Sequence, residues 1–186
     1  MKRIFDVFLA ITAITILGLP MLLIAAMVRI TSTGPALYWS QRIGLKNKVF
    51  QMPKFRTMQL HTPVVATHLL DKPHRYLTPL GSLLRRYSLD ELPQFWSILK
   101  GDMSMVGPRP ALSNQNDLIA LRTQNGLHEL IPGLTGLAQI NGRDNLSIDQ
   151  KVELELDYLR RRSFWLDFKI ILMTVLKVLE KNGVSH

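Results

Sequence analysis

The segment Val7–Val28 is an unbroken run of uncharged, mostly apolar residues. As a helix, it is long enough to reach through the hydrocarbon core of a bilayer. Lys2 and Arg3 precede the run and Arg29 follows it. Both ends are therefore positively charged, whereas a helix that spans a membrane usually has its positive bias on one side only. We expect residues 1–30 to form a membrane element.

Pro20 lies near the middle of this run, close to Gly18. Proline removes a hydrogen bond from the helical ladder and bends the helix. We therefore predict a re-entrant helix, which enters and leaves the membrane at its cytoplasmic face. A straight membrane span is the second interpretation. A cleaved signal peptide is the third, since the run is longer than the usual apolar segment of such peptides and lacks a convincing small-x-small cleavage site.

Asp6 stands immediately before the apolar run. A carboxylate next to lipid hydrocarbon is costly in free energy. We expect Asp6 to form an ion pair with Arg3 or with another basic neighbour.

The formal net charge of the 186 residues is +9, and cysteine is absent. The lack of cysteine excludes disulfides and thiolate metal sites. Residues 31–186 have the size of one globular domain with a modest core. The positive charge predicts an anionic partner, for which nucleic acid, acidic lipid and phosphorylated substrates all qualify. The apolar run favours acidic lipid and phosphorylated substrates.

The fold class predicted for residues 31–186 is α+β and mostly helical. Short extended segments at 36–42 and 48–54 flank a turn at 44–47, which indicates a β-hairpin. Arg42, Lys54 and Arg56 belong to this region, where a solvated basic face against anionic lipid is one interpretation.

Helices are predicted in four places after the hairpin. A short helix covers 80–87, and a second begins near Leu89 or Asp90 and ends at Gly101. Ser147 and Gln150 form a capping box that opens a third helix, which continues through Arg162.

The last predicted helix, at 164–179, is amphipathic. Phe164, Trp165 and Phe168 lie on its apolar half, and basic residues at 160–162 precede it. These features are typical of a helix in the membrane interface. A helix in the core of the globular domain is the alternative.

The most specific pattern in the chain lies between Ser88 and Pro110. Asp90 and Glu91 begin an apolar helix, where unpaired N–H groups keep a carboxylate ionised and also attract phosphate. Such a carboxylate is able to attack or to bind a metal. Ser88 followed by Glu91 also fits a capping box, the mark of an ordinary helix start.

Basic residues flank this carboxylate pair. Arg85 and Arg86 come just before it, and Gly107–Pro110 is a proline-fixed loop that carries Arg109. The two arginines before the pair suit either simple ion pairs or a phosphate clamp. Farther on, glycines at 133, 136 and 142 allow close approach to a ligand or merely form tight turns.

Several common sites are excluded. The five histidines lack zinc-ligand spacing, and the chain contains no P-loop, no GxGxxG sequence and no serine-hydrolase elbow.

The chain resembles the small monotopic polyprenyl-phosphate phosphoglycosyl transferases, and most closely their minimal, single-domain members. The resemblance runs nearly end to end and rests on ordered motifs: Lys2-Arg3-Ile4-Phe5-Asp6, Lys54-Phe55-Arg56-Thr57-Met58, Ser88-Leu89-Asp90-Glu91-Leu92, Lys100-Gly101-Asp102-Met103-Ser104, Val106-Gly107-Pro108-Arg109-Pro110, Pro132-Gly133-Leu134-Thr135-Gly136 and Gln139-Ile140-Asn141-Gly142-Arg143.

The resemblance implies an enzyme that starts membrane-linked glycan assembly in bacteria. It would transfer a sugar 1-phosphate from a UDP-sugar, expected to be N-acetylated or a diamino sugar, to undecaprenyl phosphate and release UMP. It implies a monotopic protein at the cytoplasmic face of the inner membrane. Its partners are the UDP-sugar, the polyprenyl phosphate and membrane lipid, without nucleic acid, and a homodimer is a candidate assembly.

The resemblance also implies roles for individual residues. Asp90 would be the nucleophile that forms a covalent phosphosugar intermediate, and Mg²⁺ would bridge Asp90, Glu91 and the diphosphate. Substrate-binding roles fall on Arg85, Pro108, Arg109, Arg143, Lys54 and Arg56.

Two other classes of function compete with this one. A basic nucleic-acid-binding module would explain the charge, but no such motif occurs and the aromatic residues do not alternate with the basic ones. A non-catalytic membrane adaptor would explain the apolar segments, but it gives no role to Asp90, Glu91 and Arg109.

Overall fold

The computed structural model describes residues 1–63, 73–142 and 145–179. It confirms an α+β fold that is mostly helical. In chain order the elements are α1 (Lys2–Thr31), β1 (Leu37–Ile43), β2 (Val49–Phe55), α2 (Gly81–Arg86), α3 (Phe95–Lys100), β3 (Ser104–Val106), α4 (Asn116–Gln124), β4 (Gly133–Thr135), α5 (Leu137–Ile140), α6 (Ile148–Arg161) and α7 (Phe164–Leu179). Short 3₁₀ helices lie at Leu45–Asn47, Pro73–Tyr76, Leu89–Gln94 and Leu127–Glu129.

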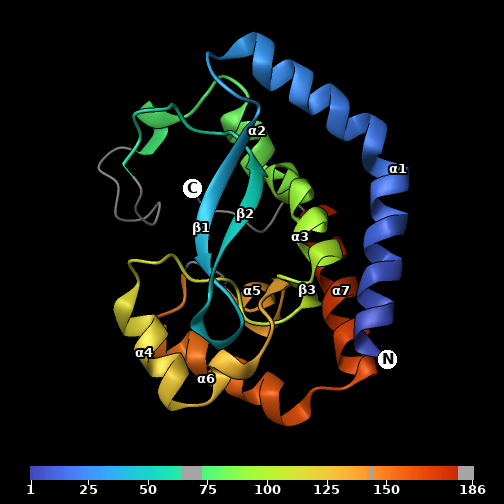
Figure 1. The fold of residues 1–186 in the computed structure, drawn as a ribbon, viewed down its shortest axis with the longest axis vertical. Helices are drawn as coiled ribbons and strands as arrows, with labels where there is room; N and C mark the ends of the chain where they lie inside the picture. Colours follow the sequence, from blue (N-terminus) through green and yellow to red (C-terminus); the bar gives the residue numbers. More distant parts are fainter. Residues whose placement is uncertain (64–72, 143–144, 180–186) are drawn as a thin grey trace.

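Helix α1 runs along one edge of the molecule and bends partway along its length (Figure 1). Pro20 lies inside it, as expected for a bent helix. By length and composition the helix is apolar enough to cross a membrane, and 11% of its most apolar window is buried. Most of its apolar surface is therefore left for another apolar environment.

The N-terminal end of α1 is fixed to the globular domain. Lys2 Nζ forms an ion pair with Asp167 Oδ2, and Arg3 donates to the carbonyls of Ile98 and Leu99. The expectation that Asp6 pairs with a basic residue is wrong. Asp6 is buried and accepts hydrogen bonds from the Ser104 hydroxyl at 2.8 Å and from the Met105 amide at 3.1 Å. Two donors on β3 satisfy this carboxylate, and no basic residue in the described part of the chain forms an ion pair with it.

The C-terminal end of α1 is fixed to the same domain. Ile24 and Val28 pack against Phe55 of β2 and Leu84 of α2. Arg56 donates to the carbonyl and the hydroxyl of Ser32, directly after the helix. Both ends of the apolar helix therefore contact one globular body.

The β-hairpin lies where it was predicted. Strands β1 and β2 pair antiparallel, with Tyr38 opposite Lys54 and Arg42 opposite Phe50, so the two basic residues come from different strands of one ribbon. The burial of Arg56 contradicts the interpretation that this region is a solvated basic face. Its side chain is buried, and it donates to the backbone of Pro35 as well as to Ser32.

A second, parallel pair joins β3 to β4. Here the backbones approach so closely that a Cβ on Gly133 would lie 2.1 Å from Gly107 N, and a Cβ on Gly136 would lie 2.2 Å from Gly107 O. The two glycines allow one segment of backbone to pass against another. Close backbone packing therefore accounts for Gly133 and Gly136, while Gly142 lies in a turn with a φ of 149°.

The capping box of α6 is confirmed: Ser147 accepts from the Gln150 amide, and the Gln150 side chain accepts from the Ser147 amide. The predicted start of α7 at Phe164 is also confirmed, and the helix continues to Leu179, the last described residue. The main hydrophobic core forms where α1, α3, β3 and the C-terminal helices meet. Ile98, Met103 and Ile170 are almost fully buried there.

Helix α7 places several of its polar side chains against the protein. Asp167 is buried, Thr174 bonds to Thr135, and Lys177 donates to the carbonyl of Ile140. The apolar side is outside, with Trp165 75% exposed and Leu172 49% exposed. Ile170 of the same helix is fully buried in the core, with Leu166 and Met173 packed against it, so α7 is part of the core on one side. Its exposed apolar stripe has the character of a membrane-facing surface.

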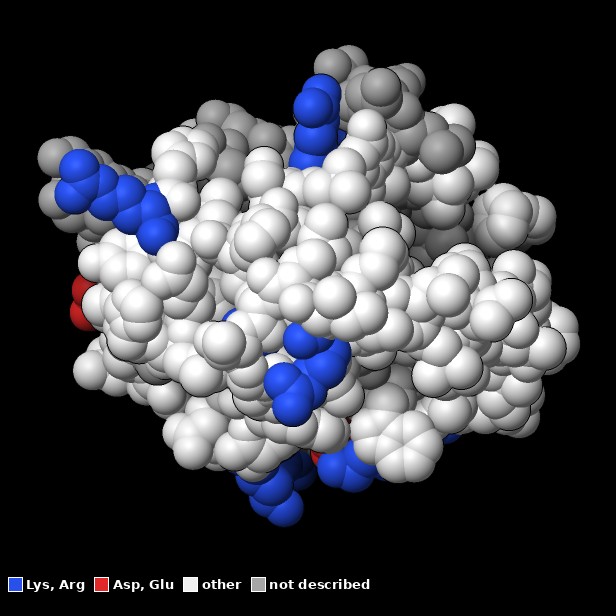
Figure 2. Space-filling model, turned by 90° about the horizontal axis from the view of Figure 1, so that it is seen from above, with Lys and Arg blue, Asp and Glu red and all other residues white. Residues whose placement is uncertain are grey.

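The face at the C-terminal end of α1 is seen from above in Figure 2. It is largely uncharged, with separate lysine and arginine side chains, and acidic side chains are visible only near its margins. A surface of this kind suits contact with anionic lipid headgroups.

Candidate active site

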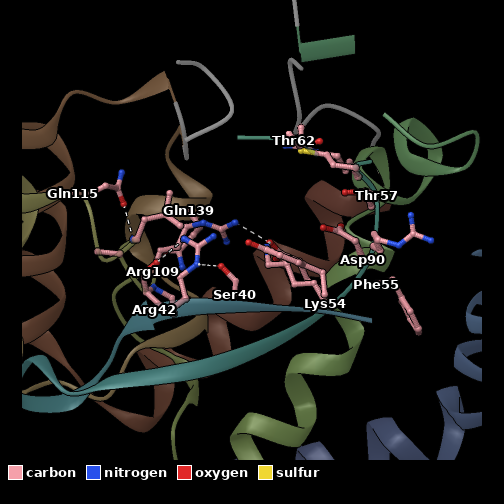
Figure 3. A pocket seen from close by; sticks show the side chains of 18 of the residues that line it. Ser40, Arg42, Lys54, Phe55, Thr57, Thr62, Asp90, Arg109, Gln115 and Gln139 are labelled. Carbon is pink, nitrogen blue, oxygen red and sulfur yellow. Dashed lines mark hydrogen bonds and ion pairs between the residues drawn. The ribbon is translucent and has the colours of Figure 1, made fainter. Parts of the chain in front are cut away.

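A pocket of about 380 Å³ opens beside the β-hairpin (Figure 3). Its walls come from β1, β2, α2, the 3₁₀ helix Leu89–Gln94, the loop after β3, and helices α4 to α6. Basic residues outnumber acidic ones in its lining: Arg42, Lys54, Arg56, Arg85, Arg109, Arg122 and Lys151 against Asp90, Glu91 and Glu155. Such a pocket is suited to an anionic ligand.

Asp90 and Glu91 enter the pocket from a 3₁₀ helix that precedes α3. Ser88 begins this segment with a φ of 54°, a left-handed conformation that turns the chain sharply. The capping box proposed there is wrong, because Ser88, within the described part of the chain, makes no side-chain cap hydrogen bond. Gly101 ends α3 with a φ of 96°, as predicted. The carboxylates are thus held on a short, tightly wound segment, 9% and 7% exposed.

One oxygen of Glu91 accepts from two cations. Lys54 Nζ lies 2.9 Å and Arg109 Nη2 lies 2.8 Å from Glu91 Oε1. Burial lowers the pKa of the Lys54 ammonium, although the charge of Glu91 acts in the opposite direction. Glu91 therefore connects the hairpin to the loop after β3, and its neighbour Asp90 lines the same pocket.

The loop that carries Arg109 is fixed through its backbone. Arg42 Nη1 donates to the carbonyl of Pro110 at 3.2 Å, and Arg122 Nη1 donates to the carbonyl of Arg109 at 2.9 Å. Arg122 is held in turn by both carboxylate oxygens of Glu155, at 2.8 Å and 2.5 Å. Burial raises the pKa of the Glu155 carboxyl, and Arg122 opposes that shift.

The structure brings together four of the predicted site residues in addition to Glu91: Asp90, Lys54, Arg85 and Arg109 all line the pocket. Figure 3 shows Lys54 between Arg109 and Asp90. Together they place two carboxylates beside fixed cations. This arrangement can bind a diphosphate and present an oxygen nucleophile to it.

Three predicted residues have other placements. Arg56 reaches the pocket wall, but its guanidinium bonds to the segment after α1. Among the described residues, Pro108 is not part of the lining, and its carbonyl accepts from the Gly133 amide. Arg143 lies outside the described residues.

Sequence reasoning missed the contributions of Arg42, Arg122 and Glu155 to this site. Arg42 was noted only as part of a basic face. Arg122 lies on α4 and Glu155 on the amphipathic helix α6, and single charges on helices are usually solvent-exposed. Their role is evident only from the hydrogen bonds between them, which join residues 33 positions apart in the chain.

Comparison with known proteins agrees with this geometry. The family model for bacterial sugar transferases matches residues 1–181. The chain is 41% identical over 188 residues to the uncharacterized sugar transferase EpsL of Bacillus subtilis, covering 100% of this chain and 91% of the relative.

Two longer relatives carry more specific names. The UDP-glucose:undecaprenyl-phosphate glucose-1-phosphate transferase of Escherichia coli is 37% identical over 185 residues, which cover 95% of this chain and 40% of the relative. The undecaprenyl-phosphate galactose phosphotransferase of Salmonella typhimurium is 33% identical over 198 residues, covering 98% and 41%. The chain therefore spans less than half the length of these two proteins. With a match over residues 1–181 and a pocket suited to phosphate chemistry, the chain belongs to the bacterial sugar transferase family.

Proposed function

We propose that the chain transfers a sugar 1-phosphate from a UDP-sugar to undecaprenyl phosphate and releases UMP. The names of the relatives from E. coli and S. typhimurium support this acceptor and this class of reaction. One observation carries the proposal: Asp90 and Glu91 lie side by side in a basic pocket, and Glu91 is engaged by two cations.

The reaction proceeds in two displacements at one phosphorus atom. An Asp90 carboxylate oxygen attacks the phosphorus that bears the sugar, and the bond from this phosphorus to the bridging oxygen breaks, so that UMP departs with the electron pair. A phosphate oxygen of undecaprenyl phosphate then attacks the same phosphorus. The bond to Asp90 breaks, which gives polyprenyl diphosphosugar and restores the carboxylate.

Other side chains serve this chemistry by charge and position. Arg109 and Lys54 stabilise the negative charge that develops on the phosphoryl oxygens. Their common bond to Glu91 holds both cations near Asp90, so Glu91 acts by positioning them. Arg85 lines the same pocket and supplies a further contact for the diphosphate.

The site fits a magnesium ion. Among the described residues, no group of three or more His, Cys, Asp or Glu side chains converges. Mg²⁺ is commonly held by only one or two carboxylates together with substrate phosphates, which matches the pair Asp90 and Glu91. When bound, Mg²⁺ would neutralise charge on the diphosphate and the departing phosphate. The residues that would hold it are Asp90 and Glu91.

The fold supports a monotopic protein at the cytoplasmic face of the inner membrane. The two ends of α1 contact the same globular domain, through Asp6 at one end and Val28 at the other. A helix that is held in this way is able to dip into one leaflet and return. Residues 1–30 would then be the membrane element and residues 31–186 the catalytic domain. The exposed apolar side of α7 would lie in the interface.

A donor panel tests the proposal directly. Purified protein in detergent receives undecaprenyl phosphate, Mg²⁺ and one UDP-sugar at a time. The panel includes N-acetylated and diamino sugars, as well as UDP-glucose and UDP-galactose. We expect UMP release with at least one donor, abolished by Asp90→Asn with thermal unfolding unchanged. Equal release by wild type and variant would overturn the proposal.

A further inference from the structure

The buried pair of Arg122 and Glu155 joins helices α4 and α6 in the wall of the pocket. Side chains of Arg122 and Glu155 are 11% and 3% exposed, and both oxygens of Glu155 accept from the guanidinium. A bidentate pair of this kind fixes the plane of the guanidinium as well as its position. Removing such a pair from water is costly, so a gain in stability alone does not explain it.

The third guanidinium nitrogen of Arg122 contacts the loop that carries Arg109. Arg122 Nη1 lies 2.9 Å from the carbonyl of Arg109, whose own side chain reaches Glu91 at 2.8 Å. Two ion pairs, Glu155 with Arg122 and Arg109 with Glu91, are therefore linked by the hydrogen bond from Arg122 to the backbone carbonyl of Arg109.

Arg109 needs such a support. Pro108 and Pro110 on either side have no N–H group, so the loop has few donors of its own with which to fix its position. Its carbonyls must be held by donors from elsewhere, and Arg122 and Arg42 provide them at Arg109 and Pro110.

We propose that Arg122 and Glu155 are positioning residues for the proposed sugar-phosphate transfer. Glu155 orients Arg122, and Arg122 fixes the backbone of Arg109, so that the Arg109 guanidinium meets the transferred phosphate in the correct place. The inference rests on the proposed function. It assigns a positioning role to a pair whose hydrogen bonds run to each other and to the backbone of Arg109.

A double-mutant cycle tests this relationship. Arg122→Lys keeps the positive charge beside Glu155, but a single ammonium cannot reproduce the fork that serves Glu155 and the Arg109 carbonyl together. We expect kcat to fall roughly 100-fold, the scale of a small misplacement of a catalytic group, with little change in KM for the UDP-sugar. Glu155→Gln should act in the same direction. In an Arg109→Ala background, neither substitution should lower kcat further.

Asp157→Asn is the matched control. Asp157 lies on the same helix as Glu155 and pairs with Arg161 on the exposed surface, so its loss should leave kcat unchanged. Losses that multiply between Arg122→Lys and Arg109→Ala would overturn the inference, because they would show that Arg122 acts independently of Arg109.

A second measurement does not depend on turnover. Hydrogen exchange of a peptide covering residues 107–112 should be faster in Arg122→Lys than in wild type, while exchange in the β1–β2 hairpin stays the same. Unchanged exchange at 107–112 would show that Arg122 does not hold the loop that carries Arg109. If wild type releases no UMP with any donor, the proposed function fails and this measurement decides the inference by itself.

Discussion

Arg109 and Glu91 form an ion pair at 2.8 Å, although 18 positions separate them in the chain. The pair joins the proline-fixed loop after β3 to the 3₁₀ helix that carries both carboxylates. Lys54 of β2 donates to the same oxygen of Glu91. The loop and β2 thus both contact one oxygen of the 3₁₀ helix next to Asp90, and this convergence defines the site.

Replacement of Arg109 should therefore affect catalysis more than folding. Arg109→Ala removes one preorganised cation, and losing a single contact of this kind typically costs about 100- to 1000-fold in rate. The side chain is 28% exposed, so the melting temperature should change little. Turnover by UMP release and thermal unfolding measure the two effects. Arg161→Ala, on an exposed surface pair, serves as control, and near-normal turnover of Arg109→Ala would show that the loop is only structural.

Lys54 predicts an alkaline limit to activity. Its pKa is lowered by burial, so the ammonium loses its proton at a pH below its ordinary 10.5 and the ion pair with Glu91 is then lost. Turnover should fall as pH rises through this lowered pKa. Lys54→Arg, which stays charged, should move the fall to higher pH. Lys46→Arg, at an exposed pair, is the control. If turnover of Lys54→Arg falls at the same alkaline pH as turnover of wild type, the loss of activity does not arise from Lys54.

The contribution of Lys54 to stability should change with pH in the opposite direction to turnover. Between the lowered pKa of Lys54 and 10.5, the unfolded chain binds more protons at this residue than the folded chain does. The contribution of Lys54 to the free energy of unfolding therefore increases with pH in that window. Urea unfolding of wild type and Lys54→Met across the window measures this contribution, and a difference that does not vary with pH would contradict it.

Local sequence rules predicted the parts of the fold that depend on neighbours. The hairpin around Gly44, the capping box of Ser147 with Gln150, and the end of α3 at Gly101 all require only nearby residues. The same rule failed at Ser88. There Ser88 adopts a left-handed conformation, with a φ of 54°, and makes no side-chain cap hydrogen bond.

Contacts between distant segments were beyond those rules. Asp6 was expected to need a cation, yet it is satisfied by an amide and a hydroxyl of β3, 98 to 99 positions away. Arg56 lines the pocket as expected, but the sequence did not indicate that it also fixes the chain after α1. The family resemblance identified Asp90 and Glu91 as the site, but nothing in the sequence indicated that Arg122 reaches the Arg109 loop.

The contacts at both ends of α1 predict the topology of the protein. Because the chain has no cysteine, a single cysteine can be introduced without interference. We expect a cysteine inserted after Met1 and a Thr33→Cys variant both to react with an impermeant thiol reagent from the cytoplasmic side only. Labelling in inverted vesicles and in intact spheroplasts distinguishes the two sides. Reaction of the N-terminal cysteine from the periplasmic side alone would establish a straight span.

The nucleophilic role of Asp90 is the central claim, and trapping the intermediate tests it most directly. Wild-type protein is mixed with UDP-sugar and Mg²⁺ without polyprenyl phosphate, then quenched and analysed by mass spectrometry. A carboxylate nucleophile needs no acceptor for the first displacement, so UMP should appear in an amount limited by the enzyme, with a phosphosugar adduct on Asp90. Asp90→Asn should show neither product. Turnover that requires the acceptor from the start, with no adduct on the quenched enzyme, would remove Asp90 from this role.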